Sequence, residues 1–316
     1  MKKIPNLFIC GAPKAGTTTM HALLSQHPQI YLTKDKEPHY FCSDFHAEAV
    51  KFHGGKKKIF HYKSENEYLN LFEDTGQTQY SGEASVTYFF SKLAAKNIYD
   101  FNKRSKIIII LRKPIEMAYS WYNYLYARGL EDLESFQEAL DKEDFRKRTP
   151  RLIHKNALYP SSVYYSDLMK IDQHVKRFLD LFPRENIYFL LFDDIKKDAE
   201  KSYGKVLEFL NLQNDTEIEV ELLNKGAQVR NIQLKRVIDS QLKNMQRALL
   251  PHREHVIVKA MHKLYTSLFF NQSSYKKEDL DNIKLNLDLN DIIVRTEKLI
   301  VMDLLKRWEK DHIIKA

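Results

Sequence analysis

A glycine loop near the amino terminus has the residues and spacing of a phosphate-binding site. Gly11 and Gly16 are five residues apart, and Thr17 and Thr18 follow them directly. Glycines let backbone N–H groups turn inward around an oxyanion, and the helix that follows such a loop adds the positive end of its dipole. The segment therefore predicts binding of a nucleotide phosphate between a strand and a helix.

The lysine of this loop is not where kinase and ATPase loops have it. Those loops place lysine between the second glycine and the Ser/Thr, a position that Thr17 holds here, whereas the lysine of this chain is Lys14. The apolar run at 106–111 also continues directly into Arg112, at a place where a magnesium-binding aspartate would be expected. This combination indicates a nucleotide whose transferred group does not need magnesium.

Arg112 and Ser120 are the next candidates for anion binding. Arg112 follows a buried apolar run, so its guanidinium would lie at the carboxyl edge of the sheet, where open α/β folds bind ligands. Ser120 comes eight residues later, about two helical turns away. We therefore expect the two side chains to face the same side.

Three continuous apolar runs supply the strands that would position these residues: Leu7–Cys10, Lys106–Leu111 and Ile187–Phe192. Apolar residues at helical spacing accompany each run, and Pro114 suits the first position of a helix. Runs without polar alternation are typical of a parallel sheet covered on both faces. The predicted fold class is α/β, a P-loop-containing three-layer α/β/α arrangement with a central, mainly parallel sheet and a helical C-terminal part.

The last third of the chain has a different pattern. Apolar periodicity without a strong strand predicts helices at 203–210, 236–250 and 296–308. Neither an internal repeat nor a convincing linker divides the chain. We therefore expect one domain over residues 1–316, made of a nucleotide-binding α/β core at 1–210 and a mainly helical part at 211–316.

The bulk properties narrow the class of partner. A formal charge of +8 favours anionic ligands, but the charge is dispersed and no recognition motif indicates a nucleic-acid partner. Two cysteines cannot build a disulfide framework, which favours a reducing compartment and a cytoplasmic location. No apolar stretch approaches the length of a membrane span, so we expect no transmembrane segment.

Several segments together resemble the sulfotransferase superfamily, in the bacterial branch related to heparan sulfate sulfotransferases. Residues 8–18 and 24–28 are similar to the family's 5'-phosphosulfate loop, and residues 110–114 with 118–120 are similar to its 3'-phosphate motif. Weaker similarities span about two thirds of the chain, and they are Lys36-Glu37-Pro38-His39-Tyr40-Phe41, Gly82-Glu83-Ala84-Ser85-Val86-Thr87-Tyr88 and Phe182-Pro183-Arg184-Glu185-Asn186-Ile187.

The resemblance implies an enzyme that moves a sulfuryl group from 3'-phosphoadenosine 5'-phosphosulfate (PAPS) to an acceptor by in-line displacement. The desulfated product would be adenosine 3',5'-bisphosphate (PAP), and no metal would be required. Lys14 would lie beside the oxygen that bridges phosphate and sulfate, where negative charge grows as the S–O bond breaks. The other residues that the resemblance assigns to the nucleotide are Ala15, Gly16, Thr17 and Thr18 at the 5'-phosphate, and Arg112 and Ser120 at the 3'-phosphate.

Two further nucleotide contacts are expected from the later part of the chain. Tyr164, with Tyr165 as the alternative, matches the region that packs on the adenine, and core packing is an almost equal interpretation. Arg230, together with Asn224-Lys225-Gly226, is the candidate for a late loop that closes over the nucleotide.

Glu37 and His39 are the candidates for the base that activates the acceptor. Residues two apart in an extended segment point the same way, so both could reach one site. We favour Glu37 as base with His39 as orienter, and the reverse assignment stays open. Ala84 stands where the glycan-acting branch has a lysine, which weakens the assignment of a glycan acceptor but not that of sulfuryl transfer. A glycan or glycolipid hydroxyl is the first expectation, and a small-metabolite or polyketide-type hydroxyl is the second.

Two other functions remain as alternatives. A small-molecule kinase with an altered phosphate loop would bind ATP with magnesium and would show no preference for a 3'-phosphate. A non-catalytic protein for anionic ligands could keep the same fold, although the presence of Lys14, Glu37 and His39 argues against it. The sequence does not determine the oligomeric state.

Overall fold

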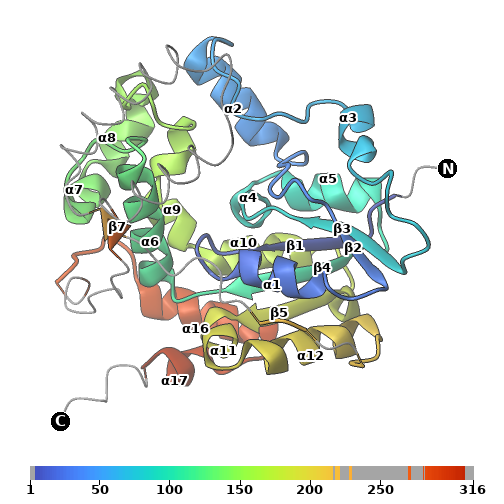
Figure 1. The fold of residues 1–316 in the computed structure, drawn as a ribbon. Coiled ribbons are helices and arrows are strands. Elements are labelled where there is room, and N and C mark those ends of the chain that lie inside the picture. The colour runs from blue at the N-terminus through green and yellow to red at the C-terminus, as the bar shows by residue number, and fades with distance from the viewer. Residues whose placement is uncertain are drawn as a thin grey trace.

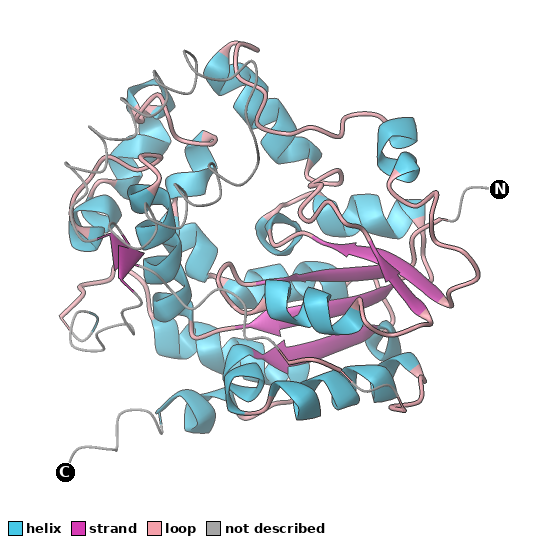
Figure 2. Cartoon of the chain, viewed as in Figure 1, coloured by secondary structure: helices cyan, strands magenta, loops and turns pink. Residues whose placement is uncertain are grey.

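The computed structural model describes residues 4–215, 218–220, 228–229, 270–271, 280 and 282–309. Five parallel strands form the central sheet in the order β2-β3-β1-β4-β5 (Figures 1 and 2). Their bounds are β1 Leu7–Gly11, β2 Ile30–Leu32, β3 Tyr80–Ala84, β4 Lys106–Leu111 and β5 Ile187–Leu191. The sheet confirms the predicted α/β class and its parallel order.

Helices cover both faces of this sheet and also stand beyond its carboxyl edge. On one face lie α1 (Thr17–Leu24), α11 (Phe192–Lys197) and α12 (Ala199–Leu210). The opposite face is covered by α4 (Thr87–Phe90), α5 (Ala94–Phe101), α10 (Ile171–Leu179) and α16 (Leu289–Ile300). Because both faces are covered, the side chains of β1 and the apolar side chains of β4 are buried.

A further group of helices lies outside these two layers, most of them at the left and top of Figure 1, with Glu65–Asn70 at the upper right and Leu304–Glu309 at the lower left. The longest is α6 (Pro114–Ala127), which is separated from β4 by two residues. The others are α2 (Ser43–His53), α3 (Glu65–Asn70), α7 (Phe136–Asp141), α8 (Glu143–Arg148), α9 (Tyr165–Met169) and α17 (Leu304–Glu309). Single 3₁₀ turns lie at Pro150–Leu152, Pro160–Val163 and Arg184–Asn186.

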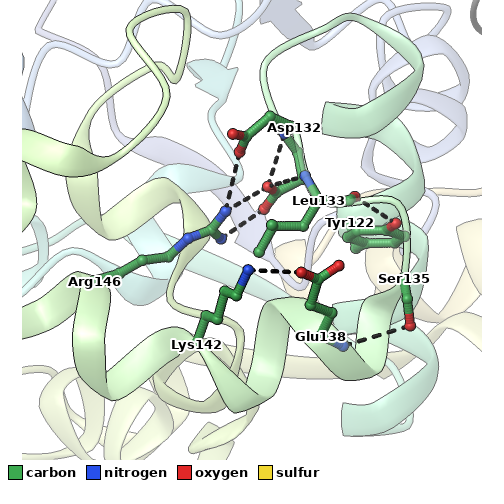
Figure 3. Close-up of polar contacts among 8 residues, drawn as sticks. Tyr122, Asp132, Leu133, Ser135, Glu138, Lys142 and Arg146 are labelled. Atoms are coloured by element: carbon green, nitrogen blue, oxygen red, sulfur yellow. Dashed lines mark hydrogen bonds and ion pairs between the residues drawn. The ribbon is translucent and has the colours of Figure 1, made fainter.

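A buried ion pair fixes the segment that follows α6 (Figure 3). Arg146 holds the fully buried Glu131 with two hydrogen bonds of 2.7 and 2.5 Å, and Tyr165 donates a third of 2.8 Å. Although burial opposes the charge, the Arg146 guanidinium holds the pKa of Glu131 below its usual value. Tyr122 of α6 donates to the carbonyl oxygen of Leu133, at 2.9 Å. The carboxyl end of α6 is therefore tied to α8 and α9.

Two parts of the predicted secondary structure were wrong. The helix expected at 296–308 is two helices, because Val301 adopts a left-handed φ of 57° that ends α16. Strands β2 and β3 were not predicted, since β2 has three residues and β3 carries the polar Ser81 and Glu83 in its buried interior.

The part of the chain after residue 210 is described only in pieces. The helix expected at 236–250 lies outside the described residues. A two-residue antiparallel pair, β6 (Gln228–Val229) with β7 (Phe270–Asn271), lies within the part expected to be mainly helical. Within the described residues, every helix is too short or too polar to cross a bilayer.

Candidate functional site

The phosphate loop connects β1 to α1 at the carboxyl edge of the sheet, as the sequence predicted. Gly11 has a φ of 145° and lies against β4 so closely that a Cβ there would stand 2.2 Å from the Ile110 carbonyl oxygen. Gly16 has a φ of 85° and precedes the first residue of α1. Both positions need glycine, because a side chain would clash or strain the backbone. The loop thus presents the uncapped amino end of α1 beside the sheet edge.

Lys14 stands in this loop with a left-handed φ of 62°, and its ammonium lies 5.6 Å from the ring centre of Tyr124 on α6. Burial lowers the pKa of Lys14, and the positive charges of Arg128, Arg112 and Lys36 lower it further. The loop therefore lies where several cations converge, which is a suitable environment for a ligand with more than one negative charge.

Arg112 joins the phosphate loop to the end of β4. Its Nη1 donates a hydrogen bond of 2.9 Å to the Lys14 carbonyl oxygen, and its Nη2 lies 3.4 Å from Glu116. The guanidinium also lies 4.8 Å from the Phe192 ring centre. Its Nε is buried and has no hydrogen-bond partner in the described part of the chain. A buried guanidinium N–H without a partner, next to a phosphate loop, suits an anionic ligand.

For the other residues expected to contact the nucleotide, the structure gives a position in the fold but fewer contacts within the site. Thr17 and Thr18 open α1, next to Ala15 and Gly16, and Ser120 is half-buried within α6. Tyr164 lies between the turn at Pro160–Val163 and α9, with the Lys147 ammonium 5.4 Å from its ring centre. It has no hydrogen bond or ring contact with the described residues of the phosphate loop. Arg230 and residues 224–226 lie outside the described residues.

Glu37 and His39 come together, but not through an extended segment. Both have left-handed φ values, 63° and 56°, so the expected extended conformation was wrong. Two hydrogen bonds hold the segment against the end of β3, from the Glu37 N–H to the Ala84 carbonyl oxygen at 3.0 Å and from the His39 N–H to the Ser85 hydroxyl at 3.2 Å. His39 Nε2 lies 3.3 Å from Glu37 Oε2 as a result.

The partners of His39 indicate which of its ring nitrogens carries the proton. Burial lowers the pKa of His39 to about 4, so the ring is neutral at pH 7 and has a single N–H group. Glu37 can only accept at Nε2, whereas the Thr87 hydroxyl, 2.6 Å from Nδ1, can donate. The Cys42 thiol donates to that same Thr87 oxygen at 3.1 Å, which leaves the Thr87 proton for His39. These contacts favour the tautomer with the proton on Nε2.

A cavity of about 890 Å³ adjoins Glu37 and His39. Its walls include Lys36, Phe60, Tyr62 and Tyr124 as well as these two residues. Lys36 donates to Glu37 Oε1 at 2.8 Å, so the carboxylate has a cation on one oxygen and the imidazole on the other. Because Tyr124 also contacts Lys14, the cavity adjoins the phosphate loop. Glu37 thus lies between an open volume and the loop cations.

Glu83 lies in a segment that resembles the sulfotransferase superfamily, and hydrogen bonds that the sequence did not indicate connect it to this site. It is fully buried on β3 and accepts hydrogen bonds from Ser85 at 2.7 Å, from Tyr68 at 3.3 Å and from Tyr88. Burial raises the pKa of Glu83 to about 7, against the opposing effect of the three hydroxyls. The Ser85 hydroxyl connects this carboxyl to the His39 N–H. The alternation of Glu83, Ser85 and Thr87 was the available signal.

Comparisons with known proteins agree with this arrangement. A family model described as "Sulfotransferase domain" matches residues 5–247. Human bifunctional heparan sulfate N-deacetylase/N-sulfotransferase 2 is 25% identical over 214 residues, which cover 66% of this chain and 22% of that protein. Mouse carbohydrate sulfotransferase 15 is 23% identical over 270 residues, which cover 72% of this chain and 47% of that protein. The chain therefore spans about a fifth of the first relative and about half of the second.

A solved structure is similar over almost the whole chain. The crystal structure of a sulfotransferase from Alicyclobacillus acidocaldarius superposes with a TM-score of 0.65 at 26% sequence identity. The match covers 96% of this chain and 98% of that one. The similarity thus extends beyond the phosphate loop to the entire α/β architecture.

Proposed function

Because this chain belongs to the sulfotransferase domain family, we propose that it transfers a sulfuryl group from PAPS to an acceptor hydroxyl. The family assignment confirms the resemblance seen in the sequence; the donor, the acceptor and the site roles are the proposal. PAPS supplies a sulfuryl group whose S–O bond to phosphate breaks as the acceptor oxygen bonds to sulfur.

The observation that carries the proposal is the junction of Arg112 with the phosphate loop. The Lys14 carbonyl oxygen and the Arg112 guanidinium are hydrogen-bonded, and the buried Arg112 Nε still lacks a partner among the described residues. A nucleotide with phosphates at both its 5' and 3' positions needs two neighbouring anion sites. The loop serves the first, through Ala15, Gly16, Thr17 and Thr18, and Arg112 with Ser120 serves the second.

Lys14 provides positive charge at the bond that breaks. An ammonium held at that place stabilises the charge that develops on the bridging oxygen, and its effect is larger in a partly buried site. The lowered pKa of Lys14 reflects burial and neighbouring cations, both of which a bound polyanion would counter. With Lys14, Arg112 and Lys36 close together, the site has the cationic charge for this chemistry without a metal.

Glu37 is proposed as the base and His39 as the residue that orients it. With its single proton on Nε2 and Thr87 on Nδ1, neutral His39 has no free nitrogen to accept a proton from the acceptor. It can donate to Glu37 and fix one carboxylate oxygen. Lys36 fixes the other, and the adjoining cavity gives an acceptor hydroxyl room to approach.

The cavity and the relatives support the proposed class of acceptor. A volume of about 890 Å³ lined by charged and aromatic side chains suits a sugar unit, and aromatic walls commonly contact sugar faces or flat metabolites. We propose a glycan or glycolipid hydroxyl first and a small hydroxyl metabolite second. Tyr164 and Arg230 remain proposed nucleotide contacts, at the adenine and in the late loop.

The decisive experiment compares nucleotides. Thermal shift and calorimetry should show tight binding of PAP, weaker binding of adenosine 5'-phosphate, and weak binding of ATP with or without magnesium. Transfer of radioactive sulfate from PAPS to a panel of glycans, glycolipids and phenols then tests the reaction. Stabilisation by magnesium-ATP alone would favour the kinase alternative. Binding of PAP with neither transfer to any acceptor nor hydrolysis of PAPS would favour a non-catalytic protein.

A further inference from the structure

Tyr124 carries two cations that come from different parts of the chain. The Arg128 guanidinium lies 3.7 Å from the ring centre, and the Lys14 ammonium lies 5.6 Å from the same point. Arg128 follows Tyr124 by one helical turn, so the two side chains share a face of the helix end. A hydrogen bond of 3.5 Å from Arg128 Nη1 to the Tyr124 carbonyl oxygen adds to this contact. The ring thereby holds Arg128 next to the lysine of the phosphate loop.

The charges around this ring do not balance. The positive groups that act on Lys14 are Arg128, Arg112 and Lys36. Arg112 has Glu116 as a partner and Lys36 has Glu37, whereas Arg128 has no carboxylate partner among the described residues. Two like charges near one aromatic ring repel each other, and an anion bound by both would reduce that cost. An exposed guanidinium held beside the partly buried Lys14 is an arrangement that favours the binding of an anion.

The position of Arg128 along α6 separates it from the proposed 3'-phosphate site. Ser120 precedes it by eight residues, which is about 12 Å along a helix. Its neighbour Tyr124 lines the cavity that Glu37 and His39 adjoin. Arg128 is exposed, and its guanidinium lies on the ring of a residue that lines this cavity.

The helix end that carries Arg128 is held in place. Trp121 donates to the Ser162 carbonyl oxygen at 2.9 Å, and Tyr122 donates to Leu133. Directly after Arg128, Gly129 takes a left-handed φ of 67° that ends the helix. The buried Glu131 and Arg146 pair then anchors the next turn (Figure 3). A guanidinium on such a support is pre-organised for a ligand.

From these observations we propose that Arg128, held on Tyr124, binds the sulfuryl group of the donor together with Lys14. This inference rests on the proposed function and names one further residue of the same site. A guanidinium can give two parallel hydrogen bonds to sulfuryl oxygens, which the single ammonium of Lys14 cannot do.

The test compares PAPS with PAP, which differ only in the sulfuryl group. Calorimetry is done with wild type, Arg128→Ala and Arg128→Lys, and the integrity of PAPS is checked after each titration. Arg128→Ala should weaken PAPS binding about 10- to 100-fold and PAP binding less than about 3-fold. Arg128→Lys should recover part of the loss, because it keeps the charge but not the fork. Tyr124→Ala should reproduce the loss by removing the support.

Lys103→Ala is the matched control, since Lys103 is an exposed cation 5.7 Å from the ring centre of Tyr99 and comes just before the first residue of β4, at the amino edge of the sheet. It should leave both affinities unchanged. Equal weakening of PAP and PAPS by Arg128→Ala would overturn the inference, and so would unchanged PAPS affinity with a raised KM for the acceptor. Failure of the wild type to bind PAP would instead refute the proposed function, so the two failures are distinguishable.

Discussion

The guanidinium of Arg112 donates a hydrogen bond of 2.9 Å to the carbonyl oxygen of Lys14, across 98 residues of sequence. This bond makes one site of the two motifs that the sequence shows separately. It exists because β1 and β4 are neighbours in register, with Gly11 opposite Ile110, so the loop after one strand meets the residue after the other. The close approach of these strands in turn requires glycine at position 11.

Replacement of Arg112 should remove discrimination for the 3'-phosphate. Arg112→Ala should lower the preference for PAP over adenosine 5'-phosphate by about 10- to 100-fold, because a charge-assisted pair of hydrogen bonds is lost. Calorimetry with both nucleotides measures this ratio. Arg184→Ala is a matched control, since that guanidinium lies 5.0 Å from the Phe189 ring centre and donates to a carbonyl oxygen at the other end of the sheet. An unchanged ratio in Arg112→Ala would remove Arg112 from the site.

Replacement of Lys14 should affect turnover much more than nucleotide affinity. Lys14→Ala should lower the rate of sulfuryl transfer about 10²- to 10³-fold, because the ammonium acts on charge that develops only as the bond breaks. Affinity for PAP should change only a few-fold, since PAP lacks the sulfuryl group. Single-turnover kinetics and calorimetry separate the two effects. Equal losses of rate and affinity would contradict the role proposed for Lys14.

The sequence predicted those parts of the fold and site that local chemistry determines. β4 could be predicted because Ile107–Leu111 is an unbroken apolar run, and the phosphate loop could be predicted from the spacing of its glycines. β3 was missed because Glu83 is a charged residue type in a buried strand, which only its three hydroxyl partners make acceptable. The left-handed backbone of Glu37 and His39 depends on hydrogen bonds to β3, so no local pattern could indicate it.

Contacts between segments that are distant in the sequence were the second feature that the sequence could not predict. Lys14 approaches the Tyr124 ring that Arg128 also contacts only because α6 lies beside the loop after β1, and the neighbours of these residues in the sequence do not show this. In the same way, the hydroxyl that contacts His39 Nδ1 belongs to Thr87, 48 residues away. Residue type and spacing thus predicted which groups do chemistry, whereas their pairing required the tertiary structure.

The buried carboxyl of Glu83 should make stability depend on pH. Its pKa is about 7 in the folded chain and about 4.5 when unfolded, so the folded state binds the proton more tightly between these values. The stabilisation is complete below pH 4.5 and is lost as pH rises to 7, a change of about 3 kcal/mol. His39 acts oppositely, because its lowered pKa of about 4 favours the folded state above pH 6.5.

The two opposing effects are separated with Glu83→Gln, which stays neutral at every pH. Urea unfolding at pH 4.5, 5.5, 6.5 and 7.5 gives the free energy of unfolding of both proteins. The advantage of wild type over Glu83→Gln should shrink steadily across this range. A difference that stays constant with pH would mean that Glu83 does not titrate there in the folded chain.

The Thr87 hydroxyl should control the tautomer of His39 and through it the base. In wild type, ¹⁵N NMR of the imidazole should show the proton on Nε2, because the Thr87 hydroxyl at Nδ1 can donate and the Glu37 carboxylate, 3.3 Å from Nε2, cannot. Thr87→Val removes the donor at nearly constant volume, so the Nδ1–H tautomer should become populated and kcat should fall about 10-fold. Thr87→Ser keeps the hydroxyl and should restore both the tautomer and kcat, with PAP affinity unchanged in either variant.

Since His39 is neutral, the pH profile of kcat/KM in wild type should lack an inflection near the ordinary histidine pKa of about 6.5. A wild-type ring with its proton on Nδ1 would leave Nε2 free to accept a proton, and the roles of Glu37 and His39 would then have to be exchanged.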